Sequence, residues 1–230
     1  MKHLFILFAF LISFWSTQAQ DYKQEREKMV TDQIASRGIK HVETLDAMRK
    51  AERHLFVPAE SMRMAYGDGP LSIGYGQTIS QPYIVAYMTQ IIEPKADFKI
   101  LEIGTGSGYQ AAVLAEIVDQ VFTIEIVPEL AKTATDRLRE LAYDNVEVIS
   151  ADGYYGLEEE APFDAIVVTA AAEHIPPSLI QQLKEGGKMV IPVGSPFLVQ
   201  TLMLVEKKNG KVSTSSLMPV RFVPFTRGRE

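Results

Sequence analysis

The stretch Leu101-Glu102-Ile103-Gly104-Thr105-Gly106-Ser107-Gly108 decides the fold. It closes a short apolar run, residues 99–103, that predicts a strand, and it precedes residues 109–118, whose apolar side chains recur at helical spacing. A glycine-rich turn between a strand and a helix is typical of an open α/β sheet, in which ligands bind beyond the carboxyl ends of the strands. Glycines there let the backbone approach a ligand closely, so the turn predicts a ligand site.

An acidic residue lies at the end of the second predicted strand, and another lies just after the third. Glu125 stands 21 residues after Gly104, and an acid about 20 residues beyond such a turn is placed to accept the ribose hydroxyls of an adenosine ligand. Asp152 comes directly after the third strand, where it would reach an adenine amino group, and Gly153 would leave room for the ring. The three positions together predict an adenosine-containing ligand.

The ligand is not expected to carry a pyrophosphate. Residues 104–120 contain no lysine or arginine, and Glu102 adds negative charge beside the turn. The turn reads G-x-G-x-G followed by Tyr109, so it matches neither the dinucleotide fingerprint nor the phosphate-binding P-loop. A cationic adenosine ligand fits better, and S-adenosylmethionine, with its sulfonium and amino groups, is such a ligand.

Beyond residue 99 strand and helix patterns alternate. This order predicts an α/β fold with a doubly wound, mostly parallel sheet covered on both faces. Residues 211–223, around Asn209-Gly210, predict an antiparallel hairpin at the sheet edge. The predicted strands are 99–103, 121–126, 146–150, 163–168, 188–193 and 200–205, and the predicted helices are 109–118, 128–142 and 177–183, the last ended by Gly186-Gly187.

Two segments precede this sheet. Residues 21–64 predict an amphipathic helical extension, with Met29, Ile34, Val42, Leu45 and Met48 in the apolar positions. Residues 66–80 carry four glycines in the ten positions from 67 to 76, which predicts an ordered loop that serves as a wall of the site. We expect residues 65–230 to form one globular unit with the extension.

The first twenty residues predict a secretory signal peptide. Lys2 and His3 precede a mainly apolar stretch, residues 4–15, and small residues at Thr17 and Ala19 suggest cleavage near Ala19. Twelve residues are too few for a permanent transmembrane helix, so no stable membrane anchor is expected. The mature chain is expected to be exported, periplasmic or secreted, with a cytoplasmic location as the alternative.

Composition limits the chemistry further. The 230 residues carry a net charge of −6 and no cysteine, which excludes disulfides, thiolate metal sites and cysteine nucleophiles. An acidic chain gives no reason to expect a nucleic-acid partner. His174 has no second histidine nearby, so no metal site is predicted.

Several motifs together resemble the protein-L-isoaspartate O-methyltransferase family. They are Ala65-Tyr66-Gly67-Asp68-Gly69-Pro70-Leu71-Ser72-Ile73-Gly74, Gln77-Thr78-Ile79-Ser80-Gln81-Pro82, the turn at 101–108, Ala161-Pro162-Phe163-Asp164-Ala165-Ile166, Gly186-Gly187, Pro192-Val193-Gly194 and Pro219-Val220-Arg221-Phe222-Val223-Pro224. The likeness covers residues 24–226. It implies a Rossmann-like methyltransferase that uses S-adenosylmethionine, without a metal, to methylate the α-carboxyl of L-isoaspartyl residues in damaged proteins, which initiates their repair.

The resemblance also assigns residues. It implies Ser80 as the catalytic residue, orienting the substrate carboxylate, although a serine there would also suit a helix cap. Ser80, Arg221 and Val223 would bind the substrate, with the segments 66–80 and 221–224 meeting above the cofactor. The expected cofactor-binding residues are Gln77, Thr78, Ile79, Ser80, Gly104, Thr105, Gly106, Glu125, Asp152, Gly153 and Thr226.

Alternatives stay open at this point. One is an exported, non-catalytic module that binds damaged protein. Another is a methyltransferase of the same fold that acts on a different carboxylate. A nucleic-acid methyltransferase is disfavoured, because Thr169-Ala170-Ala171-Ala172 stands where an Asn-Pro-Pro-Tyr type loop would be required. We expect a monomer whose partners are proteins and peptides bearing L-isoaspartyl residues.

Overall fold

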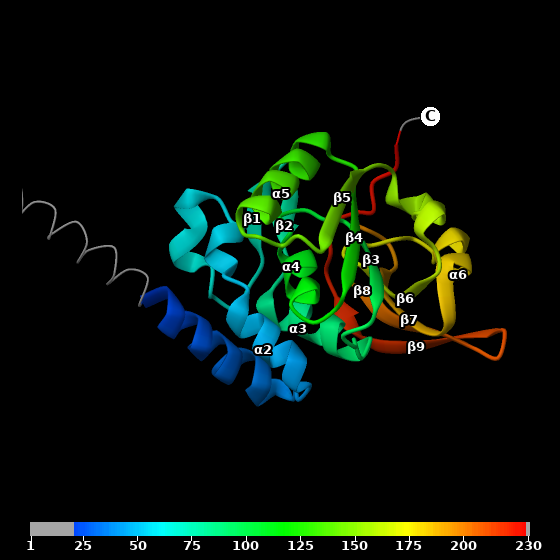
Figure 1. The fold of residues 1–230 in the computed structure, drawn as a ribbon, viewed down its shortest axis with the longest axis horizontal. Helices are drawn as coiled ribbons and strands as arrows, with labels where there is room; N and C mark the ends of the chain where they lie inside the picture. The colour runs from blue at the N-terminus through cyan, green and yellow to red at the C-terminus, as the bar shows by residue number, and fades with distance from the viewer. Residues whose placement is uncertain (1–20, 229–230) are drawn as a thin grey trace, which may run out of the picture.

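A seven-stranded sheet forms the centre of the computed structural model, which describes residues 21–228. The predicted signal peptide therefore lies outside the described residues. The strands are β3 Lys99–Ile103, β4 Gln120–Glu125, β5 Val146–Ser150, β6 Phe163–Val168, β7 Leu183–Val193, β8 Gln200–Lys208 and β9 Lys211–Val220. Their order is β5-β4-β3-β6-β7-β8-β9 (Figure 1). Neighbours from β5 to β7 pair in parallel, and β8 and β9 pair antiparallel, which confirms the predicted fold class.

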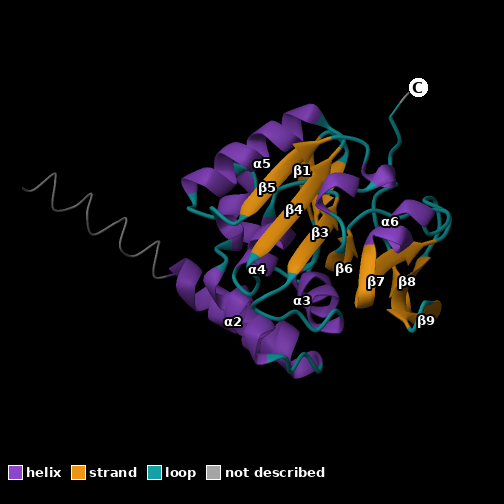
Figure 2. Cartoon of the chain, turned by 45° about the vertical axis from the view of Figure 1, so that its right-hand side comes forward, coloured by secondary structure: helices purple, strands orange, loops and turns teal. Residues whose placement is uncertain are grey.

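Helices cover both faces of this sheet, as Figure 2 shows. They are α3 Pro82–Ile91, α4 Tyr109–Ala115, α5 Pro128–Glu140 and α6 Pro177–Gln182. Successive side chains of a strand point to opposite faces. Ile100 of β3 accordingly packs with α3 and α4, through Met88 and Leu114, while Leu101 packs with Leu179 of α6. Strands buried on both faces explain why these segments are apolar throughout.

The chain reverses its direction across the sheet between β3 and β6. From β3 it proceeds outward through β4 to β5, and then returns to β6 on the other side of β3. Ile103, at the end of β3, pairs with Ile124 on one side and Val168 on the other. In open α/β sheets such a switch point leaves a crevice at the carboxyl ends of the strands, where ligands bind.

The N-terminal extension is helical, as predicted. Residues 21–28 are helical, and short helices follow at η1 Met29–Ile34, η2 Ala35–Arg37, α2 Val42–Lys50, η3 Arg53–Phe56 and η4 Ala59–Met64. Met29, Ile34 and Met48 are fully buried and share a core with Tyr109 of α4. Val42 departs from the predicted pattern, because it begins α2 and is 62% exposed.

The prediction of a loop at residues 66–80 is wrong in part. β1 Leu71–Gly74 and β2 Gln77–Ile79 form an antiparallel hairpin within it. Tyr75 and Gly76 make the turn with positive φ angles of 53° and 72°, as a two-residue hairpin turn requires. The glycines provide the turn, and the alternation of Leu71 and Ile73 with small residues provides the strand.

The hairpin at the sheet edge is confirmed, with Asn209 and Gly210 at positive φ between β8 and β9. β9 ends at Val220, before the predicted end at 223. Gly186-Gly187 do not end a helix, because β7 already begins at Leu183 and runs through them. Within residues 21–228 no helix is long and apolar enough to cross a membrane.

Candidate active site

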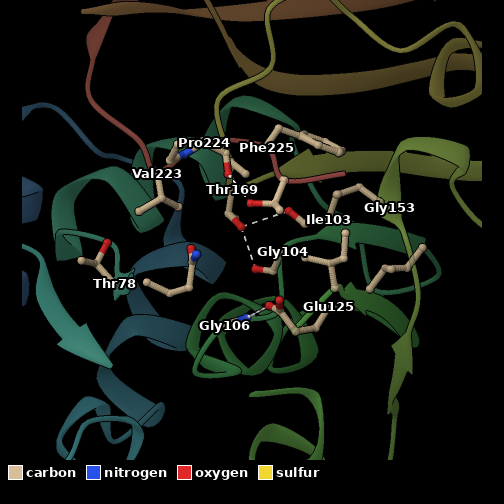
Figure 3. A pocket seen from close by; sticks show the side chains of 15 residues that line it. Thr78, Ile103, Gly104, Gly106, Glu125, Gly153, Thr169, Val223, Pro224 and Phe225 are labelled. Atoms are coloured by element: carbon tan, nitrogen blue, oxygen red, sulfur yellow. Dashed lines mark hydrogen bonds between the residues drawn. The ribbon is translucent and has the colours of Figure 1, made fainter. Parts of the chain in front are cut away.

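A pocket lies at the switch point (Figure 3). It is open to solvent on one side. Residues at or just after the carboxyl ends of β3, β4, β5 and β6 line it, together with residues of β2 and of the C-terminal segment 223–226. The lining residues are Gln77, Thr78, Ile103, Gly104, Gly106, Ile124, Glu125, Ile126, Gly153, Thr169, Ala170, Val223, Pro224, Phe225 and Thr226. We call this the switch-point pocket.

The glycine turn is held from both neighbouring strands. Gly104 has a φ of 98°, and a Cβ added to it would lie 2.4 Å from the Thr169 Oγ1 atom. The Thr169 hydroxyl donates to the carbonyl oxygens of Gly104, at 2.7 Å, and Ile103, at 3.0 Å. The amides of Gly104 and Thr105 donate to the Ile124 carbonyl oxygen. Glycine is thus required at 104 by the approach of Thr169, and these two amides are satisfied within the protein.

Glu125 forms the acidic floor of the pocket. The residue is 5% exposed, and its two carboxylate oxygens accept hydrogen bonds from the amides of Gly106, at 2.8 Å, and Val127, at 2.9 Å. An ionised carboxylate has about four acceptor positions, so two remain for ligand hydroxyls. No lysine or arginine is among the described residues that line this pocket. This acidic lining therefore fits a cationic adenosine ligand, as predicted.

Asp152 does not line the switch-point pocket. Its Oδ1 atom accepts from the Tyr154 amide, and its Oδ2 atom accepts from the Arg227 Nε atom, both at 3.0 Å. Burial opposes ionisation of Asp152, but these hydrogen bonds outweigh it and lower the pKa of the carboxyl. Gly153 does line the pocket, and a Cβ there would lie 2.5 Å from the Ile103 Cγ2 atom. Packing against β3 is therefore a reason for this glycine that the sequence did not reveal.

A smaller pocket lies on the other side of the glycine turn. Thr78, Ile79, Ser80, Thr105 and Glu102 are among its lining residues. Glu102 is completely buried, which raises the pKa of its carboxyl to about 8.

The Glu102 carboxyl belongs to a chain of hydroxyl contacts. Its Oε2 atom accepts from the Thr123 hydroxyl at 2.6 Å, and that hydroxyl lies 2.7 Å from the Thr105 hydroxyl. The Oε1 atom has no hydrogen-bond partner among the described residues. One carboxyl oxygen therefore remains available beneath the turn.

A larger, open groove lies beside these pockets. Ser80, Arg221 and Val223 line it together. The segments around Ser80 and Val223 therefore meet, as expected. Thr78, Thr169 and Val223 line both the groove and the switch-point pocket, so the two sites adjoin.

Ser80 is not a helix cap. The N-cap of α3 is Gln81, which makes no side-chain capping bond. Within residues 21–228 no hydrogen bond engages the Ser80 hydroxyl, and no ion pair engages Arg221. Arg37, the other arginine of the groove, is paired with Asp68. A hydroxyl and a cation are thus available to a carboxylate in the groove.

The predicted site residues converge, with one exception. All except Asp152 line the switch-point pocket, the smaller pocket or the groove. Thr169 lines all three and was missed as a site residue. Its place directly after β6 was the available signal, because polar residues at strand ends meet at the switch point.

Comparison with known proteins agrees with this geometry. The family model for protein-L-isoaspartate(D-aspartate) O-methyltransferase matches residues 24–230. A protein-L-isoaspartate O-methyltransferase of Opitutus terrae is 60% identical over 203 residues, covering 88% of this chain and 87% of the relative. Protein-L-isoaspartate O-methyltransferase 1 of Nitrosospira multiformis is 56% identical over 213 residues, covering 91% and 90%.

Solved structures show the same fold. A protein-L-isoaspartate O-methyltransferase superposes with a TM-score of 0.80 at 27% identity over 86% of this chain, which spans 65% of that structure. A Plasmodium falciparum chain described as a protein-L-isoaspartate O-methyltransferase, in complex with S-adenosyl-L-homocysteine, superposes with a TM-score of 0.76 at 27% identity, covering 90% of this chain and 99% of that chain. The chain belongs to the protein-L-isoaspartate(D-aspartate) O-methyltransferase family.

Proposed function

We propose that this chain transfers the methyl group of S-adenosylmethionine to the free α-carboxylate of L-isoaspartyl residues in damaged proteins. The observation that carries the proposal is the shared wall between the two sites. Thr78, Thr169 and Val223 line both an acidic pocket suited to an adenosine cation and an open groove. The groove holds the Ser80 hydroxyl and the Arg221 guanidinium, which have no hydrogen-bond or ion-pair partner among residues 21–228. A bound cofactor and a substrate carboxylate would meet at that wall.

The reaction does not require the protein to remove a proton from the substrate. A carboxylate with a pKa near 4 is ionised at neutral pH, so it needs no general base. S-adenosylmethionine, when bound, supplies an already activated methyl group. The Ser80 hydroxyl donates a hydrogen bond to the carboxylate, and Arg221 attracts it into the groove. Catalysis then consists of orientation, which can contribute up to roughly 7–11 kcal/mol.

Glu125 binds the ribose hydroxyls through its two unused acceptor positions. The C-terminal segment closes the opposite side of the pocket, as Figure 3 shows for Val223, Pro224 and Phe225. Neither Glu125 nor this segment contacts the methyl group that is transferred. Their role is to hold the cofactor with its methyl group toward Ser80.

Labelled S-adenosylmethionine and a matched pair of peptides test the function. The peptides differ only in carrying isoaspartate or aspartate at one position. We expect label on the isoaspartyl peptide alone. Equal labelling of both would indicate a methyltransferase for another carboxylate, and cofactor binding without labelling would indicate a binding module.

We also propose that the mature chain is an exported monomer. Support for export comes from the leader at residues 1–20. Fractionation of a bacterial host that expresses the full chain, with sequencing of the mature N-terminus, tests this. Recovery of the uncleaved chain in the cytoplasm would contradict export. Light scattering of the purified protein tests the monomer, and a dimer mass would contradict it.

A further inference from the structure

The C-terminal segment is anchored at one end of the switch-point pocket. Residues 223–226 line the pocket after β9 has ended. The Ala171 amide donates to the Val223 carbonyl oxygen at 2.8 Å, and the Phe225 amide donates to the Ala171 carbonyl oxygen at 2.9 Å. These bonds hold the segment beside β6. The position of its outer part depends on the residues that follow Phe225.

Arg227 anchors that outer part to the segment after β5. Its Nε atom donates to the Asp152 Oδ2 atom at 3.0 Å, and its Nη2 atom donates to the Tyr155 hydroxyl at 3.2 Å. Its guanidinium carbon lies 3.7 Å from the centre of the Tyr154 ring. The Gly228 amide also donates to the Asp152 Oδ2 atom, at 3.0 Å. One arginine thus contacts three neighbouring side chains at once.

These contacts connect two walls of the pocket. Gly153, which lines the pocket, lies between Asp152 and Tyr154, and Thr226, which lines the facing wall, precedes Arg227. Figure 2 shows the C-terminal segment leaving the sheet at the end where β4 and β5 finish. The contact therefore spans the side of the pocket that adjoins the carboxyl end of β5.

The same contacts restrict what Asp152 can do for a ligand. Three of the roughly four acceptor positions of its carboxylate are taken, by the amides of Tyr154 and Gly228 and by Arg227. The Asp152 side chain is 16% exposed and that of Arg227 is 42% exposed. Arg227 therefore fixes the orientation of a largely buried carboxylate next to Gly153, and it remains accessible to salt.

We propose that Arg227 is a positioning residue for the cofactor. Through Asp152, Tyr154 and Tyr155 it holds residues 223–226 over the pocket and fixes the Asp152 side chain beside Gly153. It sets the affinity for the cofactor and not the rate of methyl transfer. This inference rests on the proposed function only for the identity of the ligand.

The test compares Arg227→Gln, Arg227→Lys and a control, Arg139→Gln. Arg139 is an exposed arginine paired with Asp136 on α5 and lines none of the three pockets described above. The dissociation constant of S-adenosylhomocysteine is measured by calorimetry, and kcat and KM are measured with the isoaspartyl peptide. Thermal unfolding without ligand shows whether each variant is folded.

Arg227→Gln is expected to raise the dissociation constant about tenfold, the equivalent of about 1.4 kcal/mol. The KM for S-adenosylmethionine should rise in parallel, while kcat at saturating cofactor falls less than twofold. Arg227→Lys keeps the charge but loses the planar fork and the stacking, so it should restore only part of the affinity. Added salt should weaken binding in the unsubstituted protein more than in Arg227→Gln, because an exposed ion pair is screened. Arg139→Gln should change none of these values.

Two results would overturn the proposal. Tighter binding in Arg227→Gln would show that the arginine competes with the ligand for Asp152. An unchanged dissociation constant in a folded variant would show that Arg227 does not position the ligand. The binding measurement needs no peptide. Its result can therefore be interpreted even if the protein shows no activity on the isoaspartyl peptide.

Discussion

Replacement of Gly104 by alanine tests the close approach of the glycine turn to β6. An L-residue at a φ of 98° is strained, at a cost of about 1–2 kcal/mol. The new Cβ would also lie 2.4 Å from the Thr169 Oγ1 atom, so the hydroxyl must move and lose its hydrogen bond, at a further cost of about 1 kcal/mol or more. We expect Gly104→Ala to destabilise the protein by about 3 kcal/mol, or roughly 6–12 °C in Tm for a chain of this size.

Gly38→Ala is the matched control for the backbone term. Gly38 has a φ of 96°, nearly that of Gly104, but an added Cβ would have no neighbour within 4 Å. Its cost should be the strain alone, about 1–2 kcal/mol. The second comparison is the double variant Gly104→Ala/Thr169→Ala. Removal of the hydroxyl leaves the Thr169 Cβ as the nearest side-chain atom, at 3.7 Å, which is an ordinary contact.

Urea unfolding measures these terms in the unsubstituted protein, in Gly104→Ala, Gly38→Ala and Thr169→Ala, and in the double variant, and calorimetry with S-adenosylhomocysteine measures the effect on the pocket. Thr169→Ala should be destabilising on its own, since it removes a hydrogen bond, but should cost little in the presence of Gly104→Ala. Affinity should fall at least tenfold in Gly104→Ala and recover partly in the double variant. The reasoning is refuted if Gly104→Ala costs no more than Gly38→Ala, or if the two substitutions at 104 and 169 are additive.

Three further substitutions test the site. Glu125→Ala should weaken binding of S-adenosylhomocysteine at least tenfold by calorimetry, because it removes two hydrogen bonds to a charged group at about 1.5–3 kcal/mol each; unchanged affinity would contradict the ribose assignment. Ser80→Ala should lower kcat about tenfold or more and leave that affinity within twofold, since one hydrogen bond to the substrate carboxylate is lost; an unchanged kcat would remove its catalytic role. Glu102→Gln tests the buried carboxyl, whose pKa of about 8 exceeds the ordinary value of 4.5. Between these pH values the folded chain binds more protons than the unfolded chain, so stability falls as pH rises from 4.5 to 8, by up to roughly 5 kcal/mol. The variant should lack this dependence in urea unfolding at pH 5 and pH 8, and equal slopes for both proteins would contradict the assignment.

Local sequence patterns were enough to predict the central sheet and the edge of it at which the switch-point pocket lies. Strands buried on both faces require apolar runs, so β3, β4 and β6 were predicted within a residue or two, and so was the half-buried edge strand β5. The glycine turn follows β3 and Glu125 is the last residue of β4, and parallel strands bring their carboxyl ends to one edge. These features depend on hydrophobic periodicity and on the order of strands and helices along the sequence.

Patterns failed where two local preferences competed. At residues 66–80 the glycines indicated a loop, although the alternation of Leu71 and Ile73 was sufficient for a short hairpin. At Gly186-Gly187 the glycines indicated a helix end, although β7 already begins at Leu183 and its pairing with β6, irregular over these two residues, resumes at Lys188. In the hairpin, pairing between β1 and β2 outweighed the preference of glycine for a loop.

Only the tertiary structure decided the contacts between residues far apart in sequence. Thr169 lies 65 residues from Gly104, yet the switch of strand order places its hydroxyl against the turn. Arg227 lies 75 residues from Asp152, and their ion pair turns a residue predicted to face the ligand toward the C-terminal segment. The sequence by itself determined most strands of the central sheet and the edge at which we propose that a cationic adenosine ligand binds, because these follow from short-range periodicity and charge. The tertiary structure decided which side chains satisfy one another around that ligand, because this depends on strand order and on the path of the chain's last residues.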